Sequence, residues 1–249
     1  MVSLKKMQHQ DEQKEIFFFD SYVSKNHDYD VFTEYGYNRI LSEFQKMVKP
    51  LPKETVADFG CGTGAFTKKL GQFGLKCIGI DISPKSIEYA RKKYPNFKFI
   101  TANIEKTNLR SNSIDIVIFS GVLHHFQDFS ATVKEAYRVL RKGGRVFSYD
   151  PNRRNPIFWL YRDRKSPIHS RKGLTDNERL LTAEEIYHVF RRAGFRNVVI
   201  NAVFGVGFKD VKTGIAKLGL PVYNFAEMIF DKTPFARTYG SFLISKGKK

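Results

Sequence analysis

The segment VADFGCGTGAF, residues 56–66, places three glycines at alternate positions directly after a short apolar run. Without side chains, Gly60, Gly62 and Gly64 let the backbone turn tightly and approach a ligand closely. Two cofactor classes are compatible with this loop. The glycines at 60 and 62, with Ala65, match the G-x-G-x-x-G/A fingerprint of dinucleotide sites. With Asp58, the three glycines instead form D-x-G-x-G-x-G, in which an acid precedes the turn.

The position of Asp58 argues against a dinucleotide. In dinucleotide folds the pyrophosphate lies on the glycine turn and on the N-terminus of the next helix. A carboxylate two residues before the first glycine would repel that phosphate, whereas it would attract a cation such as an ammonium group. Asp81, at the end of the next apolar run, could accept hydrogen bonds from ribose hydroxyls. That acid favours an adenosine-type cofactor without choosing among such cofactors.

Two adjacent histidines in SGVLHHF, His124 and His125, follow another apolar run. Imidazole titrates near neutral pH, so either side chain could accept a proton from an acceptor group. The alternative is that one or both rings simply pack against the loop. We expect these histidines at the edge where open α/β sheets bind ligands.

The elements that position these residues alternate along the chain. Apolar runs predict strands, and amphipathic stretches between them predict helices, which is typical of a doubly wound α/β fold with a mostly parallel sheet. Residues 1–50 are predicted to form a helical lid, and 51–249 a domain interrupted by cap insertions at about 151–181 and 205–237. The expected strands are 55–60, 76–81, 96–101, 113–120, 144–150, 195–204 and 237–245, and the main expected helices are 63–74, 84–94, 130–144 and 183–194.

Five motifs in order, DFGCGTGAF, GIDIS, ANIE, IDIVIFSGVLHHF and RVLRKGGRVFSYD, strongly resemble the class I S-adenosylmethionine-dependent methyltransferases. The resemblance covers roughly residues 53–150 and is weaker from 182 to 204. It implies a seven-stranded Rossmann-like sheet in which only the last-placed strand is antiparallel. It also implies S-adenosylmethionine as the cofactor. Two cysteines alone make a poor metal site, so no metal is expected.

The resemblance assigns roles to residues of the loop and of the strand ends. Asp58 would neutralise the cofactor's amino group through water, and Ser120 would offer its carbonyl to that group. Asp81 would bind the ribose, Ile82 would pack on the adenine, and Asn103 would contact the adenine amino group in place of the usual Asp. His125 is the closer match to a base found in some small-molecule members. The implied cofactor residues are Asp58, Gly60, Cys61, Gly62, Gly64, Asp81, Ile82, Asn103, Ile104 and Ser120, and the implied catalytic residues are His125 and His124.

Residues outside these motifs are candidates for binding the acceptor. Asn152 and Arg153 follow the fifth expected strand, where an arginine could hold an anionic group by a forked pair of hydrogen bonds. Tyr35 and Tyr37 could close over the cofactor, and Trp159 lies among aromatic and basic residues in the first insertion. The alternatives are solvated arginines in a proline-bounded turn and aromatic residues in the core.

The composition limits the partners. The formal charge is +17, and residues 151–249 hold 19 lysines and arginines against 8 acids. Such a field favours an anionic partner, although a well-solvated basic surface has the same composition. The two cysteines, Cys61 and Cys77, cannot build a disulfide framework, and the polar N-terminus predicts a cytoplasmic protein.

The function that follows is methyl transfer to a small, partly apolar acceptor, anionic or lipid-linked. The aromatic and basic insertions could form a cap over an apolar pocket, or lie against an anionic membrane surface. Nucleic acid is disfavoured, because SGVLHHF stands where base-methylating enzymes carry N/D-P-P-Y/F. Two rival functions stay open: an RNA methyltransferase that uses the basic C-terminal half, and an inactive regulator that binds the cofactor.

Overall fold

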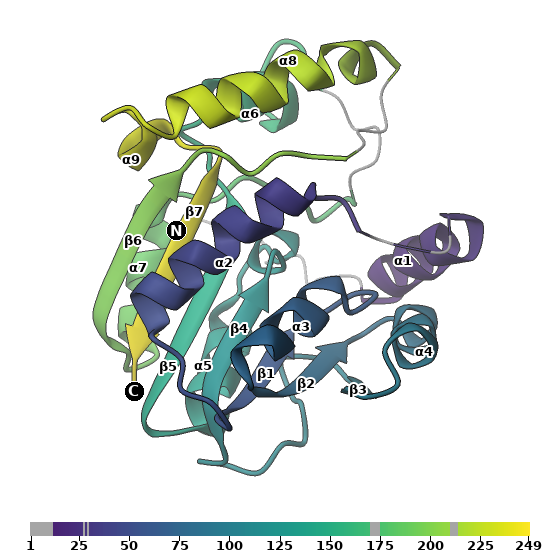
Figure 1. Ribbon diagram of the computed structural model, residues 1–249, viewed down its shortest axis with the longest axis vertical. Coiled ribbons are helices and arrows are strands. Elements are labelled where there is room, and N and C mark those ends of the chain that lie inside the picture. The colour runs from purple at the N-terminus through teal and green to yellow at the C-terminus, as the bar shows by residue number, and fades with distance from the viewer. Residues whose placement is uncertain (1–11, 27, 29, 170–174, 210–213) are drawn as a thin grey trace, which may run out of the picture.

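A seven-stranded sheet in the order β3-β2-β1-β4-β5-β7-β6 forms the centre of the computed structural model (Figure 1). The structure describes residues 12–26, 28, 30–169, 175–209 and 214–249. Only β7 runs antiparallel to its neighbours, which confirms the predicted fold class. The strands are β1 Thr55–Phe59, β2 Lys76–Asp81, β3 Lys98–Thr101, β4 Ile114–Ser120, β5 Leu140–Pro151, β6 Arg196–Val203 and β7 Phe242–Lys248.

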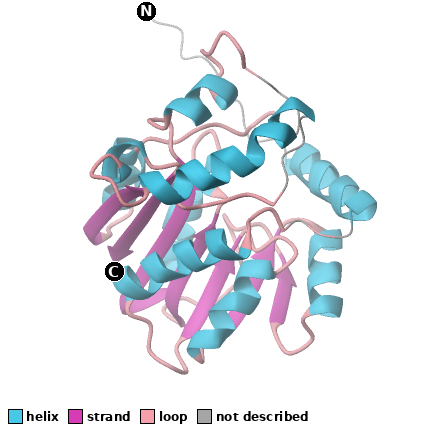
Figure 2. Ribbon diagram, turned by 45° about the horizontal axis from the view of Figure 1, so that its top comes forward, coloured by secondary structure: helices cyan, strands magenta, loops and turns pink. Residues whose placement is uncertain are grey.

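Helices cover both faces of this sheet (Figure 2). The strands supply alternate residues to two cores: Ile116 and Ile118 of β4 face one, and Val117 and Phe119 face the other. This period of two is what a strand buried on both faces requires. The helices are α1 Glu12–Asn26, α2 Glu34–Val48, α3 Ala65–Leu70, α4 Pro84–Lys93, α5 Ser130–Val139, α6 Pro156–Arg162, α7 Ala183–Arg192, α8 Gly214–Phe230 and α9 Ala236–Tyr239, with the short 3-10 turns η1 Gly71–Phe73 and η2 Leu123–His125.

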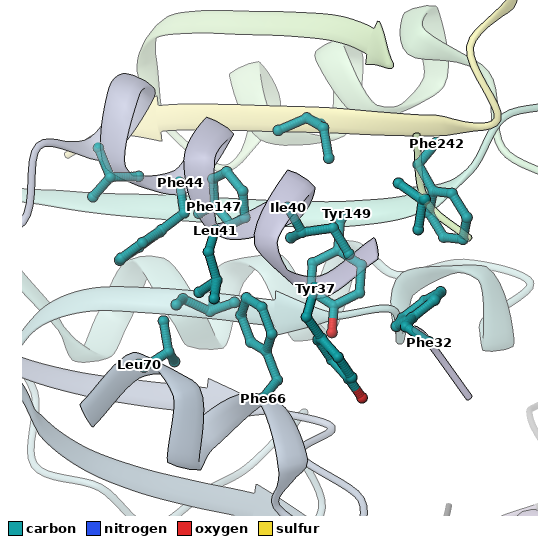
Figure 3. Packing of buried hydrophobic residues seen from close by; sticks show 14 of the residues in the cluster. Phe32, Tyr37, Ile40, Leu41, Phe44, Phe66, Leu70, Phe147, Tyr149 and Phe242 are labelled. Carbon is teal, nitrogen blue, oxygen red and sulfur yellow. The ribbon is translucent and has the colours of Figure 1, made fainter. Parts of the chain in front are cut away.

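Helix α2 is a layer of the core. Its buried side chains recur at helical spacing, and Phe44 packs edge-on against Phe147 of β5 with ring centroids 5.3 Å apart (Figure 3). Tyr37, nearer the start of α2, stacks near Phe66 of α3. Helix α2 therefore holds Tyr37 against the helix that follows the glycine loop.

Capping residues set two helix starts as the sequence predicts. The hydroxyl of Ser83 accepts a hydrogen bond from the backbone N–H of Ser86 at 3.1 Å, and Pro84 occupies the first turn. Thr182 accepts likewise from the N–H of Glu185 at 3.2 Å. The α4 start matters most, because it follows Asp81 directly.

Two predicted boundaries are wrong by five residues, and others, such as the start of β5 at Leu140 rather than 144, are wrong by less. The last strand begins at Phe242 rather than 237, because residues 236–239 form α9 and Gly240 crosses the backbone of Val203, where a Cβ would come within 2.3 Å. The helix expected over 130–144 ends at Val139, because Leu140 is buried and already pairs with Ile114 in the sheet.

The expected insertions contain α6 and α8, which lie together beyond the carboxyl ends of the parallel strands, as the upper part of Figure 1 shows. Helix α1 lies apart from them, beside α4. Residues 170–174 and 210–213 of the insertions, and 1–11 of the expected lid, are outside the described part. No described helix has the length and apolarity needed to cross a membrane.

Candidate active site

The glycine loop is held by hydrogen bonds to the neighbouring strand. The backbone N–H groups of Gly60 and Cys61 both donate to the carbonyl of Ile80, at 2.8 and 3.1 Å. Asp81 ties the loop to α4: Oδ2 accepts from the N–H of Gly62 at 2.8 Å, and Oδ1 accepts from that of Ser83 at 2.9 Å. A Cβ on Gly62 would meet no atom within 4 Å, so its bare backbone borders open space. The loop is therefore shaped before any ligand arrives.

Gly64 and Asp58 lie outside this open space. A Cβ on Gly64 would come within 2.8 Å of the Phe99 ring, so this glycine allows close packing. Asp58 is fully buried beneath the loop, where Thr67 Oγ1 donates to its Oδ2 at 2.5 Å and Ser120 Oγ donates to its Oδ1. Burial raises the pKa of Asp58 to about 6. Any effect of this carboxylate on a cofactor would act through Ser120 or through water.

A cavity of about 740 Å³ opens above the loop, within the range of roughly 300–1,000 Å³ typical of small-molecule sites. Burial raises the pKa of Asp81, and raises that of the Cys61 thiol well above its usual value. Asn103 uses its Nδ2 to donate to Glu12 Oε1 of α1 at 2.7 Å. The expected cofactor residues that line this end are Gly60, Cys61, Gly62, Asp81, Ile82, Asn103, Ile104 and Ser120.

The two histidines line the middle of the cavity, with ring centroids 4.3 Å apart. His124 Nδ1 lies 3.0 Å from Asp150 Oδ1, and burial lowers the pKa of His124 while raising that of Asp150. His125 Nδ1 lies 3.5 Å from Glu15 Oε2 of α1. Burial alone would lower the pKa of His125, but the carboxylate of Glu15 outweighs it and raises the pKa. The two imidazoles therefore differ in basicity, and His125 is the more basic.

Glu178 and Arg162 complete this polar middle. Arg162 Nη1 donates to Glu178 Oε1 at 2.6 Å, and both side chains line the cavity. Donor atoms of His124, His125 and Glu178 lie within 4.8 Å of one another, a set that could hold a metal ion. Each of the three already faces a charged or polar protein partner, so the expectation of a site without a metal stays a prediction.

The far end of the cavity is aromatic and apolar. Phe158 of α6 stacks near Tyr223 of α8, with ring centroids 6.4 Å apart. Phe208 and Phe242 pack against Phe158 from the loop after β6 and from β7. The side chains that line this end are Phe32, Ile157, Phe158, Leu160, Ile168, Phe208, Leu220, Val222, Tyr223 and Phe242.

Most of the expected acceptor residues lie outside the cavity lining. Tyr37 lines it, whereas Tyr35 is exposed on the surface. Asn152 is buried and donates to the carbonyls of residues 238 and 240, and Arg153 Nε pairs with Asp163 at 2.6 Å. Trp159 of α6 is 37% exposed and is not part of the cavity lining. Tyr35, Asn152, Arg153 and Trp159 therefore do not line the cavity, and their role in binding the acceptor stays a prediction that this arrangement does not favour.

Several residues of the cavity carried no signal that would identify them. Glu15 begins the run EIFFFDSYV, which also holds Asp20, and nothing in this run marks Glu15 as the acid that becomes buried. Glu178 lies in a loop and Arg162 at the end of α6, and only the fold brings Glu178 to the histidines and Arg162 to Glu178. Sequence spacing could not have paired Glu15 with a histidine more than a hundred residues away.

The sheet order, the glycine loop and the acid at the end of β2 define an α/β protein with a nucleoside-cofactor site at the carboxyl edge of its sheet. Residues 57–148 match the family model described as "Methyltransferase domain". This part of the chain, which holds the glycine loop and the ends of β2 and β4, is therefore similar to the class I S-adenosylmethionine-dependent methyltransferases.

Similar proteins agree with this family. A Mycolicibacterium smegmatis protein named "Probable S-adenosylmethionine-dependent methyltransferase" is 28% identical over 71% of this chain and 66% of its own length. A demethylmenaquinone methyltransferase of Chlorobaculum parvum is 32% identical over 45% of this chain and 48% of its own. The chain thus spans about half to two thirds of these relatives. A solved S-adenosylmethionine-dependent methyltransferase from Thermotoga maritima has the same fold, with a TM-score of 0.64, 22% identity and coverage of 94% of this chain and 99% of that one.

Proposed function

We propose that this protein transfers a methyl group from S-adenosylmethionine to a small, partly apolar acceptor. One observation carries the proposal: a single cavity joins the glycine loop and Asp81 at one end to aromatic side chains at the other, with His125 between them. Methyl transfer needs this arrangement, because the donor and the acceptor must meet in line with water excluded. The naming of one relative for demethylmenaquinone supports a partly apolar acceptor.

The cofactor end fits the chemistry of an adenosine ligand. Asp81 is partly buried, and each of its carboxylate oxygens keeps a lone pair beyond the backbone bonds to Gly62 and Ser83. Ile82 and Ile104 offer apolar contact for a base, and the open backbone at Gly62 leaves room for the rest. When bound, the cofactor supplies the sulfonium-activated methyl group.

His125 is the proposed base for an acceptor that must lose a proton, such as a hydroxyl. Its Nδ1 faces Glu15, so the tautomer with the proton on Nδ1 leaves the Nε2 lone pair to accept a proton. Glu15 stabilises the imidazolium that results, as a carboxylate behind a catalytic histidine does. His124, whose pKa is lowered, is the weaker base and positions its neighbour.

The aromatic end is the proposed acceptor pocket. Phe158, Phe208 and Tyr223 enclose it, and apolar lining of this kind favours an acceptor with a ring or chain. Arg162, held by Glu178, lies where it could orient a polar group of the acceptor.

Calorimetric titration with S-adenosylhomocysteine, beside NADH, tests the cofactor assignment. We expect saturable binding of S-adenosylhomocysteine alone; binding of NADH alone would assign the loop to a dinucleotide and overturn the proposal. A screen of phenolic and quinol acceptors with labelled S-adenosylmethionine then tests turnover. Cofactor binding with no turnover on any acceptor would instead support the inactive regulator.

A further inference from the structure

Helix α8 presents its apolar side to solvent. Among its described side chains, Leu218, Val222, Phe225 and Ile229 follow one another at helical spacing and are 84%, 72%, 63% and 51% exposed. A helix on the surface of a water-soluble domain ordinarily buries such a stripe. This stripe therefore calls for a partner.

The polar residues of α8 fix this orientation. Asn224 faces inward, where its Oδ1 accepts from the N–H of Phe208 at 3.0 Å and its Nδ2 donates to the same residue's carbonyl at 2.9 Å. Glu227 is buried, and its Oε2 accepts from Gly205 N–H at 2.9 Å and from Ser241 Oγ at 2.6 Å. Rotation of the helix to bury the stripe would break all four hydrogen bonds. The exposed stripe is thus built into the fold.

Helix α6 and the segment after α8 extend the apolar surface. Ile157, Trp159 and Leu160 of α6 are exposed beside α8, and Phe235 and Tyr239 are exposed beyond its end. Figure 1 shows α6 and α8 together, outermost beyond the sheet. We call the exposed apolar side chains of these segments the cap face: Ile157, Trp159, Leu160, Leu218, Val222, Phe225, Met228, Ile229, Phe230, Phe235 and Tyr239.

The cavity opens onto the cap face. Ile157, Leu160 and Val222 belong to the cap face and also line the cavity, at its aromatic end. An apolar molecule could therefore pass from whatever covers this face to the neighbourhood of His125 without crossing water.

The charges around the cap face suit an anionic surface. Lys232 and Arg237 are exposed among its aromatic residues. Between residues 218 and 240 the acids are Glu227, which is buried, and Asp231, which pairs with Arg39 at 2.7 Å. Aromatic and aliphatic side chains bordered by cations, on a chain of net charge +17, are the composition of an interfacial membrane contact.

We propose that the cap face docks on an anionic lipid bilayer, with the mouth of the cavity turned toward the lipid. This deepens the proposed function, since it makes a lipid-dissolved molecule the acceptor that reaches the pocket. The apolar stripe would insert at the boundary between head groups and acyl chains, while the cations contact the head groups.

Trp159 is the single tryptophan of the chain and lies in the cap face, so it reports on this face directly. The full chain is mixed with phosphatidylcholine vesicles with or without phosphatidylglycerol, and with vesicles whose acyl chains carry bromine. We expect cosedimentation with the anionic vesicles, a blue shift of the emission and quenching by the brominated chains. Binding without any shift or quenching would mean that the basic surface binds by another face, and would overturn the proposal.

Paired variants separate docking from folding and from the cofactor site. The double variant Leu218→Asp, Phe225→Asp should weaken vesicle binding at least about 10-fold, since both side chains are exposed and neither lines the cavity. Leu51→Asp, at an exposed apolar side chain beyond the opposite ends of the strands, is the matched control and should bind as the unaltered protein does. Both should keep the affinity for S-adenosylhomocysteine, so failure of docking is distinguished from failure of the cofactor assignment.

A second copy of the chain is the competing occupant of the cap face. In that case, sedimentation equilibrium would show a dimer that the double variant dissociates, and vesicles would not compete with it. That result would overturn docking on lipid.

Discussion

His124 and His125 are neighbours in the chain, yet each imidazole faces its own carboxylate. Asp150 lies in strand β5 of the sheet, whereas Glu15 comes from α1. Helix α1 also lines the cofactor end of the cavity through Glu12. The basicity of His125 therefore depends on whether α1 is in place. Ordering of α1 over a bound cofactor would raise the affinity of His125 for a proton at the same time.

Glu15→Gln tests this link. A base must be unprotonated to act, so kcat/KM rises with pH through the pKa of His125, which Glu15 raises. Without the carboxylate the pKa falls, and we expect the acidic limb of the profile to shift to lower pH. If Glu15 only stabilised the fold, Glu15→Gln would unfold more easily and the acidic limb would not shift.

His125→Ala should lower turnover by about 100-fold or more and leave the affinity for S-adenosylhomocysteine unchanged.

Asp81 is the second residue whose role can be isolated. We expect Asp81→Asn to weaken binding of S-adenosylhomocysteine by about 10- to 100-fold, because hydrogen bonds to a charged group contribute about 1.5–3 kcal/mol. Calorimetry measures the affinity, and circular dichroism checks the fold. Asp176→Asn, at a side chain that is 77% exposed, is the control. Equal affinities in both variants would remove Asp81 from the site.

Asp58 gives a pH dependence of stability. Its pKa is about 6 when folded and 3.8 as the ordinary value, so the folded state holds the proton more tightly. The contribution of this group to the free energy of unfolding is complete below about pH 4 and is lost as the pH rises to about 6, by about 3 kcal/mol. Urea unfolding measures the free energy of unfolding of the unaltered protein and of Asp58→Asn. As the pH rises through this interval, the unaltered protein should lose stability relative to the variant. A difference that is constant with pH would contradict the raised pKa.

At the scale of elements, the packing of α2 on the sheet sets the stability of the core. Phe44→Ala should lower the free energy of unfolding by about 3–5 kcal/mol, because the side chain is fully buried against Phe147. Phe17→Ala, at a ring that is 74% exposed, should change it by about 0.5 kcal/mol or less. Denaturant unfolding with a common slope measures both. Similar losses in the two variants would mean that α2 is not part of the cooperative core.

Most strands and helices between residues 55 and 150 could be predicted, because each is specified by residues that lie close together in the chain. The run TVADFG, the glycine turn and the Ser83-Pro84 cap each dictate a backbone conformation within a few residues, and the structure has these elements. After residue 150, the bounds of the elements depend instead on contacts between segments that are far apart in the chain. Nothing in the sequence distinguishes Gly240 from a glycine in an ordinary turn. Because it packs against the backbone of Val203, the last strand begins five residues later than expected.

The site divides in the same way. Residues that follow strand ends, such as Asp81 and His125, could be named from the order of motifs, and they line the cavity. Arg153 follows a strand end too, but Asp163 ten residues later captures it. No local sequence pattern specifies which ion pairs the charged residues after β5 form. The residues at the acceptor end of the cavity therefore could not be predicted one by one.

At the scale of the whole molecule, the net charge of +17 is the feature that most favours an RNA partner. We expect weak RNA binding that falls steeply between low and moderate salt, since it would rest on phosphate contacts alone. Methyl transfer to a small acceptor should be unaffected by ribonuclease or by added RNA. RNA-dependent turnover, measured with labelled cofactor, would instead support the RNA methyltransferase.

The sheet order also bears on how the chain is made. Among the strands that the structure describes, β6 hydrogen-bonds to β7 alone, and β7 lies between β6 and β5. During synthesis, residues 196–203 must therefore wait until 242–248 have left the ribosome before they can join the sheet. In that interval α7 and the apolar residues of β6 are exposed on a growing chain whose first five strands can already be paired. This order of assembly makes the nascent protein a candidate for chaperone capture up to its last strand.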